Sequence, residues 1–189
     1  MQTDYRKLTT FLVELGIDRV GHTERNYLAH LVSVYRLMQQ YDQDEELCLA
    51  GMFHSIYGTE KFQGFKLPLE SRGDITALIG ERAERLAYCN CFMDRQSFDD
   101  VLDQAEGTFA VTHRETAEGL ELSREDYDGL CSVHLFDWLE QVPRSRFGWD
   151  YRRAAYLQMT KRVGGRAIEA YDRVFAGEPK PTAQPDGVK

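Results

Sequence analysis

The chain has 189 residues, of which 42% are hydrophobic and 12% aromatic, enough for an ordered core without disulfide bonds. Its formal net charge of −8 argues against general binding to nucleic acids or anionic membranes, because both need a basic face. We expect one domain over residues 1–176 and a disordered tail at 177–189, which holds three of the five prolines and no large apolar residue.

The cysteines and the first residues bear on the compartment. Residues 1–16 lack the long apolar core of a signal peptide, and no run of residues is apolar enough to span a membrane. Buried free thiols are predicted rather than a disulfide framework or a zinc knuckle, because no C-x-x-C pair exists. We therefore expect a cytoplasmic protein. The four cysteines lie in apolar helical surroundings, at Cys48, Cys89, Cys91 and Cys131.

Hydrophobic periodicity predicts the first two helices. Residues 5–15 are amphipathic and are followed by Gly16, which is typical of a helix C-terminus. The second helix is expected over residues 23–41. Thr23 is its predicted N-cap, and Glu24 lies in the first turn, where its charge suits the helix dipole.

Each of two consecutive helices carries a histidine among apolar residues. His30 lies inside the apolar stripe of the second helix. The third helix begins within residues 42–46, has little polar surface, and carries His54 on an apolar face. Loops that place polar groups behind rigid helices often form sites. Hydroxyl groups follow this helix directly, on Ser55, Tyr57 and Thr59.

Two further candidates flank these helices. His22 precedes His30 by eight residues, about 12 Å along a helix axis. Two ligands of one ion each lie about 2 Å from it, so we expect His22 to contact a substrate at a pocket mouth instead. Residues 61–69 are loop-like and could form a lid beside His54, in which Lys61 would meet an anionic ligand.

The second half of the chain predicts further helices and a β-hairpin. Ser123 is the predicted N-cap of a helix that carries His134 within its apolar face and Asp137 at the edge of that face. His113, in the hairpin, is expected to be exposed. The predicted class is all-α, a bundle of about seven or eight helices with one small β-hairpin. The elements are helices at 74–79, 81–93, 123–142, 150–162 and 166–175, a helical turn at 98–102, and a hairpin of 108–116 with 119–122.

The two histidine helices resemble the HD-domain superfamily of metal-dependent phosphohydrolases. In that family a histidine early in one helix is followed by a His-Asp pair at the end of the next, and a further aspartate lies far downstream. His30 matches the first position and His54 the second, after an apolar sequence (LAGMFH, 49–54) similar to the family's. Residues 53–59 (FHSIYGT) and 79–86 (IGERAERL) also resemble an uncharacterised HD-like sub-family with an F-H-S-x-Y-G-T signature.

The resemblance implies an HD-like helical domain with a metal site made by His30, His54 and the downstream aspartate. Asp137, within the sequence VHLFDWLE, matches that aspartate best. Asn90 and Asp94 are the alternatives for the same position.

Ser55 stands where the family has the aspartate of the His-Asp pair. A neutral hydroxyl is a poor ligand for a hard cation. We therefore expect at most one divalent ion, zinc, iron or manganese, and leave open that none binds.

Three hypotheses of function follow. The first is a metal-dependent enzyme that acts on a small, phosphorylated metabolite. The second is a metal-free isomerase, cyclase or lyase that performs acid–base chemistry in the former metal cavity. Its candidate catalytic residues are His54, Tyr57, Thr59 and His22. The third is a non-catalytic protein that binds a small ligand or a partner on an HD scaffold.

The expected partners are a small-molecule substrate and, through exposed aromatic residues, a second copy of the chain. No nucleic acid, membrane or organic cofactor is expected. The candidate substrate-binding residues are Ser55, Lys61 and His134. The aromatic residues that could form a homodimer surface are Trp138, Phe147 and Trp149.

Overall fold

The computed structural model describes residues 4–22 and 25–180. Two short antiparallel strand pairs accompany the helices, and the predicted all-α class with a β-hairpin is confirmed. The strands are β1 (Gly21–His22) with β2 (Arg25–Asn26), and β3 (Phe109–Thr112) with β4 (Gly119–Leu122). The described residues form nine α-helices: α1 (Tyr5–Glu14), α2 (Tyr27–Gln40), α3 (Glu45–Phe53), α4 (Arg72–Ile79), α5 (Glu81–Phe92), α6 (Arg95–Asp100), α7 (Arg124–Gln141), α8 (Arg153–Val163) and α9 (Gly165–Phe175).

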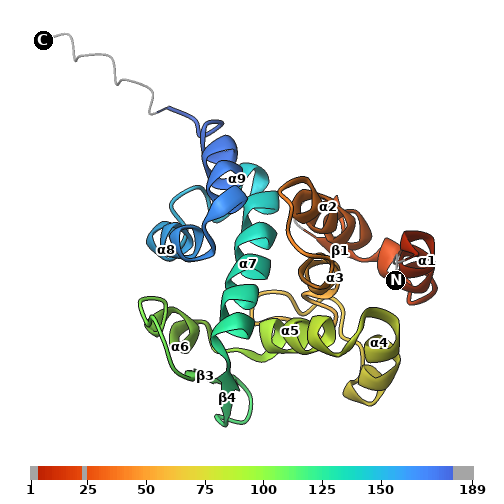
Figure 1. Ribbon diagram of the computed structural model, residues 1–189. Coiled ribbons are helices and arrows are strands. Elements are labelled where there is room, and N and C mark those ends of the chain that lie inside the picture. The colour runs from red at the N-terminus through yellow and green to blue at the C-terminus, as the bar shows by residue number, and fades with distance from the viewer. Residues whose placement is uncertain (1–3, 23–24, 181–189) are drawn as a thin grey trace, which may run out of the picture.

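Helix α7 runs through the middle of the molecule (Figure 1). It packs against α2, α3 and α5 on one side and against α8 and α9 on the other. Its start agrees with the sequence, because the Ser123 side chain accepts a hydrogen bond from the backbone N–H of Asp126 at 3.1 Å. A helix covered from both sides needs apolar residues around most of its circumference, as α7 has.

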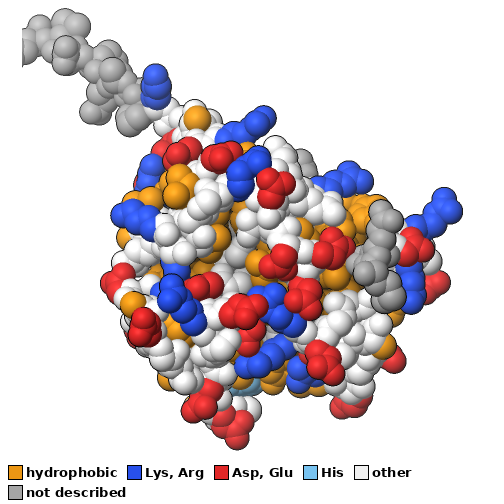
Figure 2. All heavy atoms as spheres, in the orientation of Figure 1, with side chains coloured by type: hydrophobic (Ala, Val, Ile, Leu, Met, Phe, Trp, Pro, Cys, Tyr) orange, Lys and Arg blue, Asp and Glu red, His pale blue; other side chains and the backbone are white. Residues whose placement is uncertain are grey.

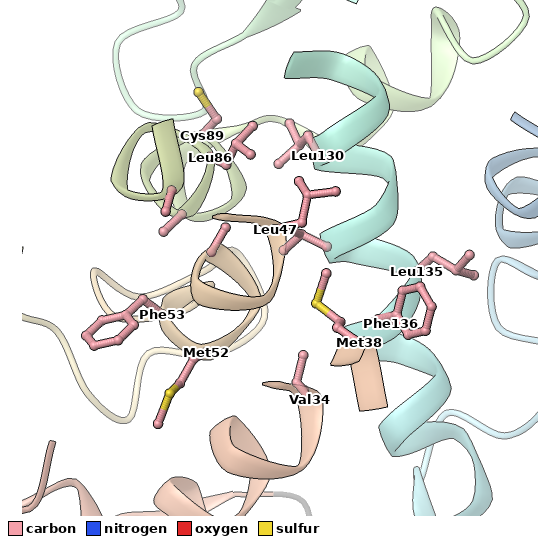
Figure 3. Close-up of a cluster of buried hydrophobic side chains, with 14 of the residues drawn as sticks. Val34, Met38, Leu47, Met52, Phe53, Leu86, Cys89, Leu130, Leu135 and Phe136 are labelled. Carbon is pink, nitrogen blue, oxygen red and sulfur yellow. The ribbon is translucent and has the colours of Figure 1, made fainter. Parts of the chain in front are cut away.

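The core lies where α2, α3, α5 and α7 meet. Figure 3 shows Leu47, Leu86 and Leu130 converging from α3, α5 and α7, while Val34 and Met38 reach toward them from α2. One continuous cluster of buried side chains extends from α1 to α9. The four cysteines are buried within the fold and unpaired, as the sequence predicted.

The surface is mixed in charge. Figure 2 shows acidic and basic side chains interspersed over one face rather than collected in a single-sign patch. Trp138, proposed above for a dimer surface, is instead buried, with its ring stacked on Tyr156 at a centroid distance of 5.3 Å. Among the described residues, no helix combines the length and the apolar character that crossing a bilayer requires.

Two expectations about helix α2 and the hairpin are wrong. Helix α2 begins at Tyr27, and Asn26 caps it by accepting a hydrogen bond from the Ala29 N–H at 2.7 Å. The start is later because β1 and β2 pair just before it; the expected cap at Thr23 and Glu24 lies outside the described residues. His113 is buried, because its ring stacks on Phe92 at 4.9 Å.

The structure adds one helix to those expected and describes the first residues of the predicted tail. The ninth helix is α6, where the sequence indicated only a helical turn at 98–102. Within the predicted tail, Glu178 accepts hydrogen bonds from both terminal nitrogens of Arg153 at 2.7 Å. Residues 181–189 of that tail lie outside the described part of the chain.

Gly51 lies where α3 packs against Met38 and Val34 of α2. A Cβ at this position would overlap the sulfur of Met38 and approach Val34 Cγ1 to 3.3 Å. We expect Gly51→Ala to lower the free energy of unfolding by about 1–3 kcal/mol, because overpacking forces the helices apart. Gly73→Ala is the matched control, since a Cβ there meets nothing within 4 Å. It should leave stability unchanged or raise it by up to about 1 kcal/mol.

Denaturant-induced equilibrium unfolding of both variants checks this prediction. Equal midpoints for Gly51→Ala and the wild-type protein would show that α2 and α3 are packed less tightly than described.

Candidate metal centre

Three potential metal ligands converge from three helices. His30 lies in the first turn of α2, His54 caps the C-terminus of α3, and Asp137 lies near the end of α7. The Nε2 atoms of the two histidines are 3.4 Å apart, and Asp137 Oδ1 lies 3.2 Å from His30 Nε2 and 3.3 Å from His54 Nε2. His30 and Asp137 are more than 100 positions apart in the chain, and His54 lies between them, so helix packing brings the three together.

The spacing of the three ligand atoms fits one ion. Tetrahedral ligands that lie about 2.0–2.2 Å from a zinc-like ion are about 3.3–3.6 Å from one another. The three separations, 3.2, 3.3 and 3.4 Å, lie at or just below this range. His30, His54 and Asp137 are therefore a candidate metal-binding group.

Hydrogen bonds on the far side of each ring orient both histidines. His54 Nδ1 lies 2.7 Å from the carbonyl oxygen of Gly51, which can only accept, so Nδ1 carries the hydrogen. His30 Nδ1 donates in the same way to Glu140 Oε2 at 2.7 Å. In each neutral ring the Nε2 lone pair then faces Asp137. This arrangement is typical of metal-bound histidines.

Without an ion, a proton must separate these groups. Burial by itself lowers the pKa of His30. Its hydrogen bonds with Asp137 and Glu140 raise the pKa by more than burial lowers it, so the pKa is about 9. Burial raises the pKa of Asp137, yet the two histidines hold it well below its usual value. The ion-free cluster thus contains a carboxylate beside a protonated imidazole, and a metal ion would replace that proton.

Further groups support the carboxylates. Glu140 is almost fully buried and pairs with Arg144, which also donates to the Glu140 carbonyl oxygen at 2.5 Å. Gln141 Nε2 donates to Asp137 Oδ1 at 2.6 Å. The ligands therefore sit in a preorganised network rather than in flexible surroundings.

The cluster forms part of the wall of a cavity of about 370 Å³. His54 and Asp137 line it, as do three of the other candidates, Ser55, Thr59 and Lys61, while His30 lies behind them. Phe62, Trp138, Phe147, Tyr151 and Tyr156 supply an aromatic part of the wall. The size suits a small metabolite.

The cavity is basic although the protein is acidic. Its only lining carboxylate is Asp137 among the described residues. Lys61 and Arg95 share the carboxylate of Glu60, at 2.7 and 4.0 Å. The four lining cations are Lys61, Arg95, Arg144 and Arg146. Two of them, Arg144 and Arg146, follow the end of α7 directly.

The structure does not bring Tyr57 or His134 to this cavity. Tyr57 is turned toward α5, where its hydroxyl donates to Glu84 at 2.9 Å. His134 is enclosed, and burial together with the charges of Arg152 and Arg95 lowers its pKa well below the usual value. The side chain of His22 lies outside what the structure describes.

Only one of the three candidates for the downstream ligand reaches the histidines, and it is Asp137. Asp94 instead caps α6 by accepting from the Ser97 N–H at 2.8 Å. Asn90 donates to the backbone carbonyl of His54 at 2.8 Å, and its side-chain oxygen lies 3.3 Å from His134 Nδ1. Ser55, at the position of the family's paired aspartate, shares a hydrogen bond of 2.9 Å with the hydroxyl of Tyr27.

Sequence reasoning missed several residues of the site. Glu140 and Arg144 support His30, and Arg95 and Arg146 line the cavity. A signal for Glu140 was available, because it lies one helical turn after Asp137 and four residues before Arg144, a pairing distance on a helix. Nothing local indicated Arg95.

Fold and site together define an all-α protein with a two-histidine, one-carboxylate cluster beside a basic cavity. Residues 11–95 match a family described as a domain of unknown function, DUF6817. The match is less than half of the chain; it contains His30 and His54, and Asp137 lies beyond it. No curated protein and no solved structure gives a significant match.

Proposed function

We propose that this protein is a metal-dependent hydrolase of the HD-domain type that acts on a small phosphorylated metabolite. The observation that carries the proposal is the convergence of His30, His54 and Asp137 at a basic cavity. Two imidazoles and a carboxylate suit zinc, iron or manganese. Such an ion supplies Lewis-acid polarisation and lowers the pKa of bound water.

One ion rather than two is supported by Ser55. Its hydroxyl is buried and already engaged with Tyr27, and it adds no negative charge to the cluster. A second divalent ion would need bridging carboxylate ligands. Among the described residues, the candidate group contains only the single carboxylate of Asp137.

The charge of the cavity supports an anionic substrate. Four cationic side chains line it, and the carboxylates among them or paired with them are those of Asp137, Glu60 and Glu140. Four cations against three carboxylates leave one positive charge, and a divalent ion adds two. An excess of three positive charges suits a phosphate monoester dianion.

The other cavity residues would bind and orient this substrate. Arg146 and Lys61 would hold the phosphate oxygens, and the Thr59 hydroxyl could donate a further hydrogen bond. The aromatic wall would cover the remainder of the metabolite and exclude bulk water around the reacting groups.

One observation favours the metal-free alternative. A proton on His30 is enough to pair this histidine with the Asp137 carboxylate, without a metal ion. Its candidate set is weakened, because Tyr57 is bonded to Glu84 and does not line the cavity. His54 and Thr59 would remain for acid–base work. The metal-dependent function therefore uses more of the site.

Turnover of small phosphate monoesters tests the proposal. We expect the wild-type protein to release phosphate only when zinc, manganese or iron is supplied, and His54→Ala to lose this activity. His113→Ala is the control, since His113 is a buried histidine on the hairpin. Metal-loaded wild-type protein without turnover, or full activity in His54→Ala, would overturn the proposed function.

Binding of inorganic phosphate tests the basic cavity separately. We expect Arg146→Gln to weaken binding at least about tenfold, because hydrogen bonds to charged groups contribute about 1.5–3 kcal/mol. Arg153→Gln is the matched control, as Arg153 pairs with Glu178 and does not line the cavity. Isothermal titration calorimetry measures both. Equal losses in the two variants would show that only the overall charge matters.

A further inference from the structure

His134 is an enclosed polar residue for which the proposed chemistry has no use. It lies on α7, one turn before Asp137, with its ring stacked on Tyr156. Its Nε2 lies 2.7 Å from a terminal nitrogen of Arg152, and its Nδ1 lies 3.3 Å from Asn90 Oδ1. A buried histidine with a partner on each nitrogen is fixed in one orientation.

The hydrogen bonds around His134 all run in one direction. Arginine can only donate, so His134 Nε2 accepts and the neutral ring carries its hydrogen on Nδ1. That N–H donates to Asn90 Oδ1, which leaves the Asn90 amide nitrogen to donate to the carbonyl oxygen of His54 at 2.8 Å. Because a carbonyl only accepts, the amide orientation of Asn90 is fixed at both ends.

This series of hydrogen bonds ends at the backbone carbonyl of His54, a candidate metal ligand. His54 caps α3, and the last carbonyls of a helix have no partner within it. Asn90 supplies one donor to the His54 carbonyl, and the Cys91 thiol supplies another at 3.3 Å. The ring of His54 is held separately through Gly51.

At the other end of this series of hydrogen bonds, Asp99 holds Arg152. Arg152 is paired with Asp99 through two nitrogens, with its Nε at 3.0 Å from Oδ2. Its backbone is left-handed, with φ of 47°, a conformation that residues with a side chain rarely adopt. A residue held in such a conformation indicates that its surroundings determine its position.

We propose that Asn90, His134 and Arg152 are positioning residues that hold His54 at the separation from His30 and Asp137 that one ion requires. These hydrogen bonds form a relay. It runs from Arg152, just before α8, through His134 on α7 and Asn90 on α5 to the end of α3. It thereby fixes the ligand that is the C-cap residue of its helix, after the last helical residue of α3. The effect of these residues on metal binding rests on the proposed function, whereas the hydrogen bonds of the relay do not depend on it.

Asn90→Asp tests the relay with a nearly isosteric change, because a carboxylate cannot donate to the His54 carbonyl. We expect zinc affinity, measured by competition with a chelating dye, to fall about 10- to 100-fold. Ser132→Ala is the control for lost stability. Ser132 is buried on α7 and bonded to Gln43 at 2.6 Å, outside the relay. It should keep the wild-type affinity.

A second pair of variants tests the direction of the bonds. His134→Gln can accept from Arg152 and donate to Asn90, so it should retain affinity close to the wild-type value. His134→Leu can do neither and should resemble Asn90→Asp. Losses in Asn90→Asp and His134→Leu that do not exceed the loss in Ser132→Ala would overturn the proposal.

A metal-free measurement separates this proposal from the proposed function. If the wild-type protein binds no ion, the metal-dependent function fails, and the imidazole resonances of His54 in the NMR spectrum decide the relay. We expect one sharp set in the wild-type protein and in His134→Gln, and broadened or doubled signals in Asn90→Asp. Identical His54 signals in all three proteins would overturn the relay.

Discussion

Asp137→Asn is expected to lower the affinity for a divalent ion by more than about 100-fold, beyond the loss that outer hydrogen-bond partners usually cause. The change keeps the shape of the side chain and removes the only negative charge among the three candidate ligands. A neutral amide oxygen is a much weaker ligand than a carboxylate. Titration calorimetry with zinc and manganese measures the effect.

Asp94→Asn is the matched control for this variant. Asp94 was the rival aspartate in the sequence, and its side chain accepts the Ser97 N–H at the start of α6. Its replacement should leave metal affinity unchanged. An equal loss in both variants, or wild-type affinity in Asp137→Asn, would remove Asp137 from the site.

Arg72→Leu should give the largest loss of stability, about 2–3 kcal/mol. Glu84 is buried and accepts from two nitrogens of Arg72, at 2.7 and 2.8 Å, and from the Tyr57 hydroxyl at 2.9 Å. Removing one partner of a buried pair costs about 3–5 kcal/mol. Because Arg72 is 38% exposed, solvent screens part of this interaction and the expected cost is smaller.

A double variant makes this prediction sharper. Arg72→Leu with Glu84→Gln removes both charges and keeps an acceptor for the Tyr57 hydroxyl, so that neither a buried charge nor a buried donor is left unpaired. The double variant should therefore recover most of the stability that Arg72→Leu loses in denaturant unfolding. If the double variant is as unstable as the single one, the loss comes from packing and not from an unpaired carboxylate.

The same cluster connects stability to the site. Tyr57 follows His54 by three residues, so its bond to Glu84 holds the turn after α3 against α5. Ser55 and Thr59, on either side of Tyr57, line the cavity. Arg72→Leu should consequently also weaken phosphate binding.

Features set by local sequence were predictable. The Ser123 cap, the apolar stripe of α2 that contains His30, and the hairpin follow from patterns within a few residues. The start of α2 was missed because the strand pair of β1 with β2 was not recognised. His113 was misplaced because its burial depends on Phe92, which lies on another element.

The same contrast between local sequence and contacts of distant elements separates the candidate ligands from the residues that hold them in place. His30, His54 and Asp137 were expected as ligands because their sequence surroundings resemble the HD-domain superfamily, and the structure brings these three together. The pairing of His30 with Glu140 spans 110 positions and depends on how α7 crosses α2. Tyr57 was expected beside His54, but the turn after α3 has no periodicity from which its direction could be read.

The X-ray absorption spectrum of protein loaded with one equivalent of zinc tests the convergence of these three side chains most directly. The account predicts stoichiometric zinc with two imidazole nitrogens and oxygen ligands, all about 2.0–2.2 Å from the metal. Sulfur at about 2.3 Å, fewer than two imidazoles, or the absence of stoichiometric binding would contradict it.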